Sequence, residues 1–319
     1  MPESCGRFRD APVAHELVCT SCNSYFGRTL DLVLARGTDE GLQRYFFDMK
    51  PKEAVEQFRY DALTIHYQGE GDYHGALLRL TADPEGPRGF RATPIDQVGF
   101  AATDGTGFEW MPLREVYSGA WKERGDLDAS MGIRIYAEDH EAVRAYLRGE
   151  GVDLPAWRHM VREGDPTEDV LVHQVSRITT DVERAIAKVA FNYLAFSNRA
   201  DFALLPAFNP VRRFVRFGEE QRDDFVHVDA EDIIFIPQPP GTPEDHRPVM
   251  HVVTVEYSRL LTSVIGQVSL FGGLRYVVCH ADTPVPGLRR SGHLFNVADL
   301  GVIRLRNRHD EPTASGKSV

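Results

Sequence analysis

The sequence has no long apolar run and few cysteines. Its most continuous apolar stretch, Leu260 to Tyr276, is interrupted by Ser, Thr, Gln and Gly and is shorter than the roughly 20 residues that a membrane-spanning helix needs. Residues 1–10 have no apolar segment behind a basic start, so no secretory signal is predicted. Four unevenly spaced cysteines suit a reducing compartment better than a disulfide framework. We therefore expect a cytoplasmic protein with no membrane partner.

Positive charge is also scarce. Lys and Arg number 36 against 47 Asp and Glu, and the formal net charge of −11 argues against a protein whose whole surface binds nucleic acid. A local basic face is compatible with this composition, and the candidates are two clusters: Arg212, Arg213 and Arg216, and Arg304, Arg306 and Arg308. The alternative is that these arginines pair with the surplus carboxylates on a solvated surface.

Two of the four cysteines form a C-x2-C pair in "VCTSCNSYFGRTLDLVLARG", residues 18–37. Structural zinc takes four N or S ligands, and thiolates usually come as two such pairs, so Cys19 and Cys22 supply half of a site. Neither Cys5 nor Cys279 belongs to a second C-x2-C. The apolar residues after the pair are spaced as in a helix that begins at Cys22, and Gly37 stands at the position of its C-terminal cap.

The rest of the chain alternates between β-rich and helical segments. "PKEAVEQF" (51–58) predicts a short helix, residues 59–110 a small antiparallel sheet, and residues 131–152 a strand followed by a helix. Residues 179–196 form the strongest helical pattern, with Thr180 and Glu183 as a capping box and an apolar stripe expected in the core: Val182, Ile186, Val189, Tyr193 and Phe196.

After this helix the pattern becomes mostly β. Strands are expected at 212–218, 225–228 and 232–238, a Pro-rich loop at 238–248, and a β-rich end with a frayed tail. We therefore expect an α+β fold in three regions: 1–50, 51–165 and 166–319.

"CTSCNSYFG" resembles the C-terminal half of the zinc-stapled HNH endonuclease motif, in which a second C-x2-C-N opens the helix of a ββα-metal unit. The matching residues are Cys19, Cys22 and Asn23, while Gly27 stands in the place of the final motif histidine or asparagine. "MPESCGRF" is similar to the hairpin segment that follows the first histidine of the motif. Three later blocks, 186–196, 208–218 and 268–278, are similar to the C-terminal region of many bacterial HNH-domain proteins.

The resemblance implies DNA phosphodiester cleavage with a catalytic Mg²⁺ or Mn²⁺ and a structural zinc ion. In the family the first histidine is the general base, and the cation stabilises the leaving oxygen. Asn23 would brace the hairpin. The first C-x2-C and the general-base histidine would precede Met1, so region 1–50 is expected to be a partial HNH unit. Loss of the base alone costs a factor of about 10² to 10⁴, and we expect no nuclease turnover from this chain.

A closed structural zinc site is possible within the chain itself. Cys5, His15, Cys19 and Cys22 could supply its four ligands. A half-site without metal is favoured over it, because members of the family tend to have an apolar residue at the place of Cys5. A further alternative for Cys19 and Cys22 is a pair of buried thiols that pack under the first helix.

Three functions remain open. The favoured one is an HNH endonuclease-family protein that is truncated and inactive, with DNA as partner. The alternative is a non-catalytic module that binds nucleic acid or another protein. The third is a metal hydrolase that uses an acidic cluster, for which a solvated face is the simpler explanation: Asp223, Asp224, Asp229, Glu231 and Asp232. Isolated histidines, His66, His74 and His140, are expected to be structural and hydrogen-bonded.

Overall fold

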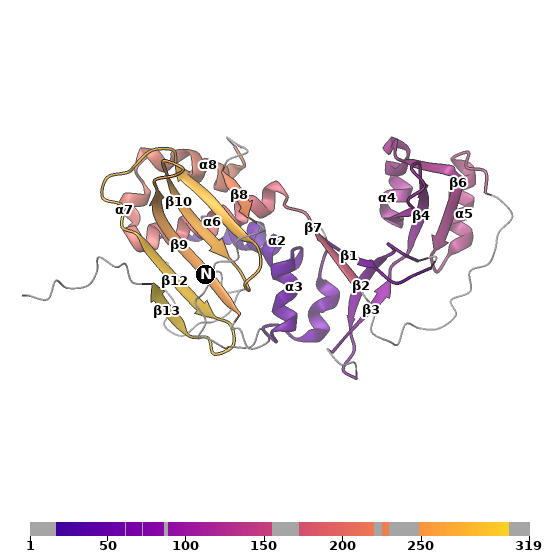
Figure 1. Ribbon diagram of the computed structural model, residues 1–319, viewed down its shortest axis with the longest axis horizontal. Coiled ribbons are helices and arrows are strands. Elements are labelled where there is room, and N and C mark those ends of the chain that lie inside the picture. The colour runs from indigo at the N-terminus through magenta and orange to yellow at the C-terminus, as the bar shows by residue number, and fades with distance from the viewer. Residues whose placement is uncertain are drawn as a thin grey trace, which may run out of the picture. The chain divides into compact units, whose positions relative to one another are not determined.

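The computed structural model describes residues 17–60, 62–71, 73–85, 89–154, 172–219, 225–229 and 249–305. The chain forms two compact units (Figure 1). Residues 52–177 make one, the inserted unit; residues 1–51 and 178–319 together make the other, the split unit. Helices and antiparallel sheets are both present, which confirms the α+β class. In the described ranges, no helix is both long enough and apolar enough to cross a membrane.

The two units divide the chain differently from the three regions expected. Residues 1–51 join the C-terminal part, because α2 (Leu30–Arg36) packs against α6 (Thr180–Asn198) and buries Leu30 and Leu34. A helix of seven residues is too short to be stable without such packing. The middle region is a continuous unit, but it ends at residue 177 instead of 165.

The split unit contains a six-stranded antiparallel sheet in the order β13-β12-β9-β10-β11-β8, and α6 packs on β9, β10 and β11. The predicted apolar stripe of α6 is buried except for Phe196, which is 38% exposed. The strands are β8 (Val226–Asp229), β9 (Met250–Ser258), β10 (Ser263–Ser269), β11 (Arg275–Ala281), β12 (Ser291–Asn296) and β13 (Val302–Leu305).

Two helix boundaries differ from the prediction. The N-cap of α6 is Thr179 and not Thr180, because the Thr179 hydroxyl accepts a hydrogen bond from the Val182 amide at 3.4 Å. The helix expected to run from Cys22 to Gly37 is interrupted at Thr29, whose hydroxyl donates to the Tyr25 carbonyl at 2.7 Å. Two short helices result, α1 (Thr20–Arg28) and α2, and a third helix, α3 (Asp39–Phe46), follows them.

The strand expected at residues 212–218 is wrong. This segment belongs to the helix α8 (Asn209–Phe217), which follows α7 (Ala200–Ala203) and the 3-10 helix η4 (Pro206–Phe208). Val211, Phe214 and Val215 are buried at spacings of three and four residues, as on one face of a helix. Pro210 occupies the first turn, and Gly218 ends the helix in the left-handed conformation with a φ of 72°. The alternation of "RFVRF" matched a strand equally well, but these end signals identify a helix.

The inserted unit has two antiparallel sheets. One is four-stranded in the order β3-β2-β1-β7, and the other is three-stranded in the order β5-β4-β6. The Gln97 side chain joins them: its oxygen accepts from the Leu77 amide at 2.7 Å, and its nitrogen donates to the Leu77 carbonyl at 2.9 Å. The unit also contains α4 (Leu113–Ser118), α5 (His140–Gly149) and the 3-10 helices η2 (Lys52–Gln57) and η3 (Ala120–Glu123).

The strands of the four-stranded sheet are β1 (Leu63–Tyr67), β2 (Leu77–Ala82), β3 (Phe90–Pro94) and β7 (Val172–Ser176). Those of the three-stranded sheet are β4 (Gln97–Ala102), β5 (Phe108–Pro112) and β6 (Leu127–Tyr136). The strands in residues 59–110 are antiparallel as predicted, but they divide between two sheets and do not form one; the strand and helix predicted in 131–152 are confirmed. The expected strand at 232–238, the Pro-rich loop and the C-terminal tail lie outside the described residues.

Candidate functional site

Cys19 and Cys22 lie at the start of α1. Cys19 is the N-cap residue, and its Sγ accepts a hydrogen bond from the Cys22 amide at 3.5 Å. The Ser21 hydroxyl lies 3.2 Å from the same Sγ. Hydrogen bonds from Ser21 and from Cys22 lower the pKa of the Cys19 thiol to about 7, and they favour the thiolate that metal binding requires.

The two thiols of the pair differ. Cys19 is exposed and Cys22 is half-buried, so the alternative of two buried thiols is wrong. The hydrogen bond with Cys19 and then burial raise the pKa of Cys22, while the positive charge of Arg216 opposes this rise. A thiolate forms first at Cys19, and the neutral Cys22 thiol beside it can donate to it.

The other ligands expected for zinc are not placed. Cys5 and His15 lie outside the described residues. In the ranges that the structure describes, no group of three or more His, Cys, Asp or Glu residues could hold a metal ion. Among the described residues Cys19 and Cys22 have no further ligand beside them, so the structural zinc site stays a prediction.

Asn23 and Gly27 are both exposed on α1. The Asn23 side chain makes no hydrogen bond to any residue that the structure describes, and the hairpin segment that it was predicted to brace lies outside this part of the chain. A Cβ atom at Gly27 would have no atom within 4 Å, so packing does not require a glycine there. The predicted role of Asn23 stays a prediction.

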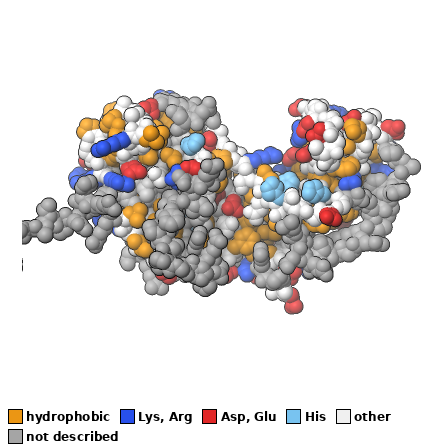
Figure 2. Space-filling view, in the orientation of Figure 1, with side chains coloured by type: hydrophobic (Ala, Val, Ile, Leu, Met, Phe, Trp, Pro, Cys, Tyr) orange, Lys and Arg blue, Asp and Glu red, His pale blue; other side chains and the backbone are white. Residues whose placement is uncertain are grey.

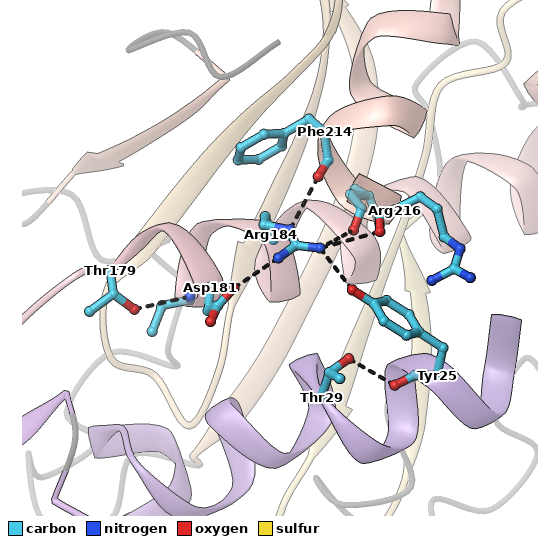
Figure 3. Close-up of polar contacts among 9 residues, drawn as sticks. Tyr25, Thr29, Thr179, Asp181, Arg184, Phe214 and Arg216 are labelled. Atoms are coloured by element: carbon cyan, nitrogen blue, oxygen red, sulfur yellow. Dashed lines mark hydrogen bonds and ion pairs between the residues drawn. The ribbon is translucent and has the colours of Figure 1, made fainter. Parts of the chain in front are cut away.

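Arg184 of α6 links α1 to the end of α8 (Figure 3). Its guanidinium donates to the carbonyl groups of Phe214 at 3.2 Å and of Val215 and Arg216 at 3.3 Å. It also donates to the Tyr25 hydroxyl at 3.2 Å. The last carbonyls of a helix lack partners within the helix, and of these three only that of Phe214 has another donor among the described residues, the Gly218 amide at 2.8 Å. The Arg184 side chain, which is 12% exposed, therefore satisfies the carbonyls of Val215 and Arg216 and holds α1 beside α8.

Arg216 stands next to the cysteine helix. Its guanidinium carbon lies 4.0 Å from the centre of the Tyr25 ring, a cation–π contact (Figure 3). It also lies 5.5 Å from the centre of the Phe217 ring. The structure thus brings together two features that the sequence predicted separately, the cysteine pair of α1 and an arginine of the 212–216 cluster.

The three arginines of this cluster differ in their partners. Arg213 is exposed and pairs with Glu219 at 2.6 Å, as the alternative of a solvated surface expects. Arg212 is bonded to the Asn209 side chain. Neither Arg212 nor Arg216 has a carboxylate partner among the residues described, and α8 contains no acidic residue.

Only one member of the acidic cluster, Asp229, lies in the described part of the chain. Asp229 lies on β8 and forms an ion pair with Arg275 of the neighbouring strand β11. The other four members, like Arg306 and Arg308 of the second arginine cluster, lie outside the described residues.

Tyr25 and Arg184 were not found by sequence reasoning. Arg184 is 30 to 32 positions away from the carbonyl groups that it binds and 159 from Tyr25. No local pattern predicts such contacts, because a helix period shows which face is buried but not which partner covers it.

Comparisons with protein-family models, curated proteins and solved structures find no match for the chain. The resemblance to the HNH endonucleases therefore depends on the quoted motif residues alone.

Proposed function

We propose that the protein binds DNA through the surface formed by α1 and α8, as an HNH endonuclease-family protein in which Cys19 and Cys22 are half of a structural zinc site. The observation that carries the proposal is the contact of Arg216 with Tyr25. Arg216 of α8 therefore lies against α1, the helix that begins at the cysteine pair. In the described part of the chain Arg216 has no carboxylate partner.

The electrostatics of this surface support contact with a phosphate backbone. The chain carries a net charge of −11, yet α8 contains no acidic residue, and two of its three arginines, Arg212 and Arg216, have no carboxylate partner among the described residues. Phosphate contacts by arginine supply affinity that does not depend on base sequence, and α1 and α8 are held together by Arg184. The surface is thus rigid as well as basic.

The thiol chemistry fits zinc. Cys19, with its pKa near 7, ionises close to neutral pH, and Cys22 follows when a cation replaces its proton. A bound Zn²⁺ would also neutralise the charge that a Cys19 thiolate presents to approaching DNA. It would act structurally, by fixing the start of α1 against the segment that supplies the remaining ligands.

Cleavage is the finer claim, and it comes from the resemblance alone. The family hydrolyses DNA with Mg²⁺ or Mn²⁺, and within the ranges described no side chains are grouped to hold such an ion. Binding is therefore the part of the proposal that the geometry supports.

Fluorescence anisotropy with a labelled duplex, measured over a series of salt concentrations, tests the proposal. We expect the variant R212Q/R216Q to weaken binding by about tenfold or more and to reduce the slope of log K against log salt by up to about 2. R259Q is the matched control, because Arg259 is exposed on the same unit between β9 and β10. Equal affinity of R212Q/R216Q and the wild type would contradict the proposal.

Two parallel assays separate the remaining alternatives. Plasmid cleavage in Mg²⁺ and Mn²⁺ decides between a nuclease and a binding module. Zinc content of the purified chain, compared between C19S/C22S and C279S, decides whether the pair holds metal. Absence of any DNA binding favours the module that binds a protein, for which the exposed Phe217 at the end of α8 is the first residue to replace.

A further inference from the structure

The inserted unit contains a cleft of about 680 Å³. It is lined by residues of β1 and β2 in the four-stranded sheet, by β5 and the start of α4, and by η2 with the residues that follow it. The volume lies within the range of sites that hold small molecules. Nothing in the motif at the start of the chain involves this unit.

The lining of the cleft is rich in arginine. Five arginines and three glutamates line it, in a chain with an excess of acidic residues. Two of the arginines have carboxylate partners: Arg124 pairs with Asp126, and Arg114 lies 3.9 Å from Glu115. The other three, Arg59, Arg79 and Arg177, are exposed and have no carboxylate within 4 Å in the described part of the unit.

Strand register places two of these free cations on one face of the sheet. His66 of β1 pairs with Leu77 of β2. Arg79 follows Leu77 by two residues, so the side chains of His66 and Arg79 lie on the same face of the sheet. Thr64 pairs with Val175 of β7, and Arg177 follows Val175 by two residues. Arg79 and Arg177 therefore flank Thr64 from the two neighbouring strands.

The polar groups between these arginines are fixed. The Gly75 carbonyl can only accept, so His66 Nδ1 donates to it at 3.0 Å, and the Thr64 hydroxyl donates to His66 Nε2 at 2.9 Å. The lone pairs of the Thr64 oxygen remain directed away from this bond. In Figure 2 histidine side chains gather over the four-stranded sheet, with cationic side chains beside them. The two hydrogen bonds confirm His66 as a hydrogen-bonded residue. The histidines in Figure 2 show that the surface over this sheet is polar.

We propose that this cleft binds a phosphate-bearing ligand, with the phosphate held by Arg79 and Arg177 on either side of Thr64. Guanidinium groups bind phosphate oxygens in pairs of parallel hydrogen bonds, and these two lack internal partners in the described chain. Phe58, Trp110 and Met111 give the same cleft an apolar portion. A ligand with a phosphate and an apolar or aromatic part fits both, and a nucleotide is the simplest one.

Calorimetric titration of the full chain with inorganic pyrophosphate and with ATP tests this proposal. We expect one-site binding of ATP with a Kd below about 1 mM. The variant R79Q/R177Q should raise the Kd about tenfold or more, because each arginine contributes charge-assisted hydrogen bonds. The matched control is R148Q, which removes an exposed arginine of α5 that does not line the cleft and should change the Kd by less than about twofold.

Phosphate can come from a free nucleotide or from a nucleic acid. A 5′-phosphorylated tetranucleotide, titrated into the R212Q/R216Q background, separates the two sources without a contribution from α8. Binding of either probe that is lost in R79Q/R177Q supports the proposal, and the tighter probe identifies the source. If R79Q/R177Q loses its circular dichroism spectrum, the single variants R79Q and R177Q replace it.

Two results would overturn the proposal. One is the absence of saturable heat with all three probes. The other is a Kd of R79Q/R177Q, or of both single variants, equal to that of the wild type. Neither result bears on DNA binding by α1 and α8, which R212Q/R216Q tests separately.

Discussion

The ammonium group of Lys188 lies 2.6 and 2.8 Å from the two carboxylate oxygens of Asp31. Lys188 is on α6 and Asp31 on α2, and the Lys188 side chain is only 8% exposed. The same ammonium lies 5.4 Å from the centre of the Phe26 ring of α1. This ion pair therefore links α2, which follows the cysteine helix α1, to α6, which packs on the six-stranded sheet.

Removal of one partner of this pair should be costly. D31A leaves the buried Lys188 charge without its partner, and we expect the free energy of unfolding to fall by about 3 kcal/mol. The double variant D31L/K188M removes both charges at similar volume and should recover most of this loss. Urea denaturation of the wild type, D31L, K188M and D31L/K188M measures the coupling as a double-mutant cycle. A loss below about 0.5 kcal/mol in D31A would mean that the pair behaves as an exposed one.

Arg184 should contribute more to the free energy of unfolding than the Tyr25 hydroxyl to which it donates. R184M keeps the apolar stem but leaves the carbonyls of Val215 and Arg216 and the Tyr25 hydroxyl without their donor, while the Phe214 carbonyl keeps the Gly218 amide, so we expect a loss of about 2 kcal/mol. Y25F removes a single hydrogen bond and should cost about 1 kcal/mol. Thermal denaturation and amide exchange at α8 provide the measurement. Equal losses in the two variants would contradict the capping role.

His280 should make the split unit sensitive to acid. Its ring is 1% exposed, and neither nitrogen has a hydrogen-bond partner in the described part of the chain. Burial lowers the pKa of His280 from 6.5 to about 3, so the folded protein keeps it neutral while the unfolded chain takes up a proton below pH 6.5. The stability due to the neutral ring is complete above that pH and is lost as the pH falls toward 3; at pH 5 the loss is about 2 kcal/mol.

The variant H280L removes this titration. Between pH 7 and pH 5 the free energy of unfolding should fall less in H280L than in the wild type. The difference between the two falls should be about 2 kcal/mol. H227Q is the control, because His227 is exposed on β8. Parallel pH profiles of H280L and the wild type would show that His280 is protonated in the folded state or reached by water.

Cys19 should be the most reactive thiol of the metal-free chain near neutral pH. The thiolate fraction rises with pH through the pKa of about 7, so alkylation by iodoacetamide should reach half of its maximal rate near that pH. S21A removes the largest cause of the shift and should move the midpoint upward. Peptide mass spectrometry of timed reactions distinguishes Cys19 from Cys22. A midpoint that is unchanged in S21A would exclude the hydrogen bond as the cause.

The sequence by itself determined the local chemistry and most of the elements. The period of α6, the C-x2-C pair at a helix start, and the alternation of the strands are local patterns that residue types fix through sterics and burial. Where local signals were ambiguous, as at residues 212–218, proline and glycine at the ends would have identified the helix.

Only the tertiary structure decided which of these elements share a core and a surface. Lys188 with Asp31, Arg184 with Tyr25, and Arg79 with Arg177 are 157, 159 and 98 positions apart, respectively. Such pairs depend on strand register and helix packing, which are set by the summed burial of many side chains and not by any short pattern. The sequence therefore predicted a cysteine helix and an arginine cluster, and the fold placed one against the other.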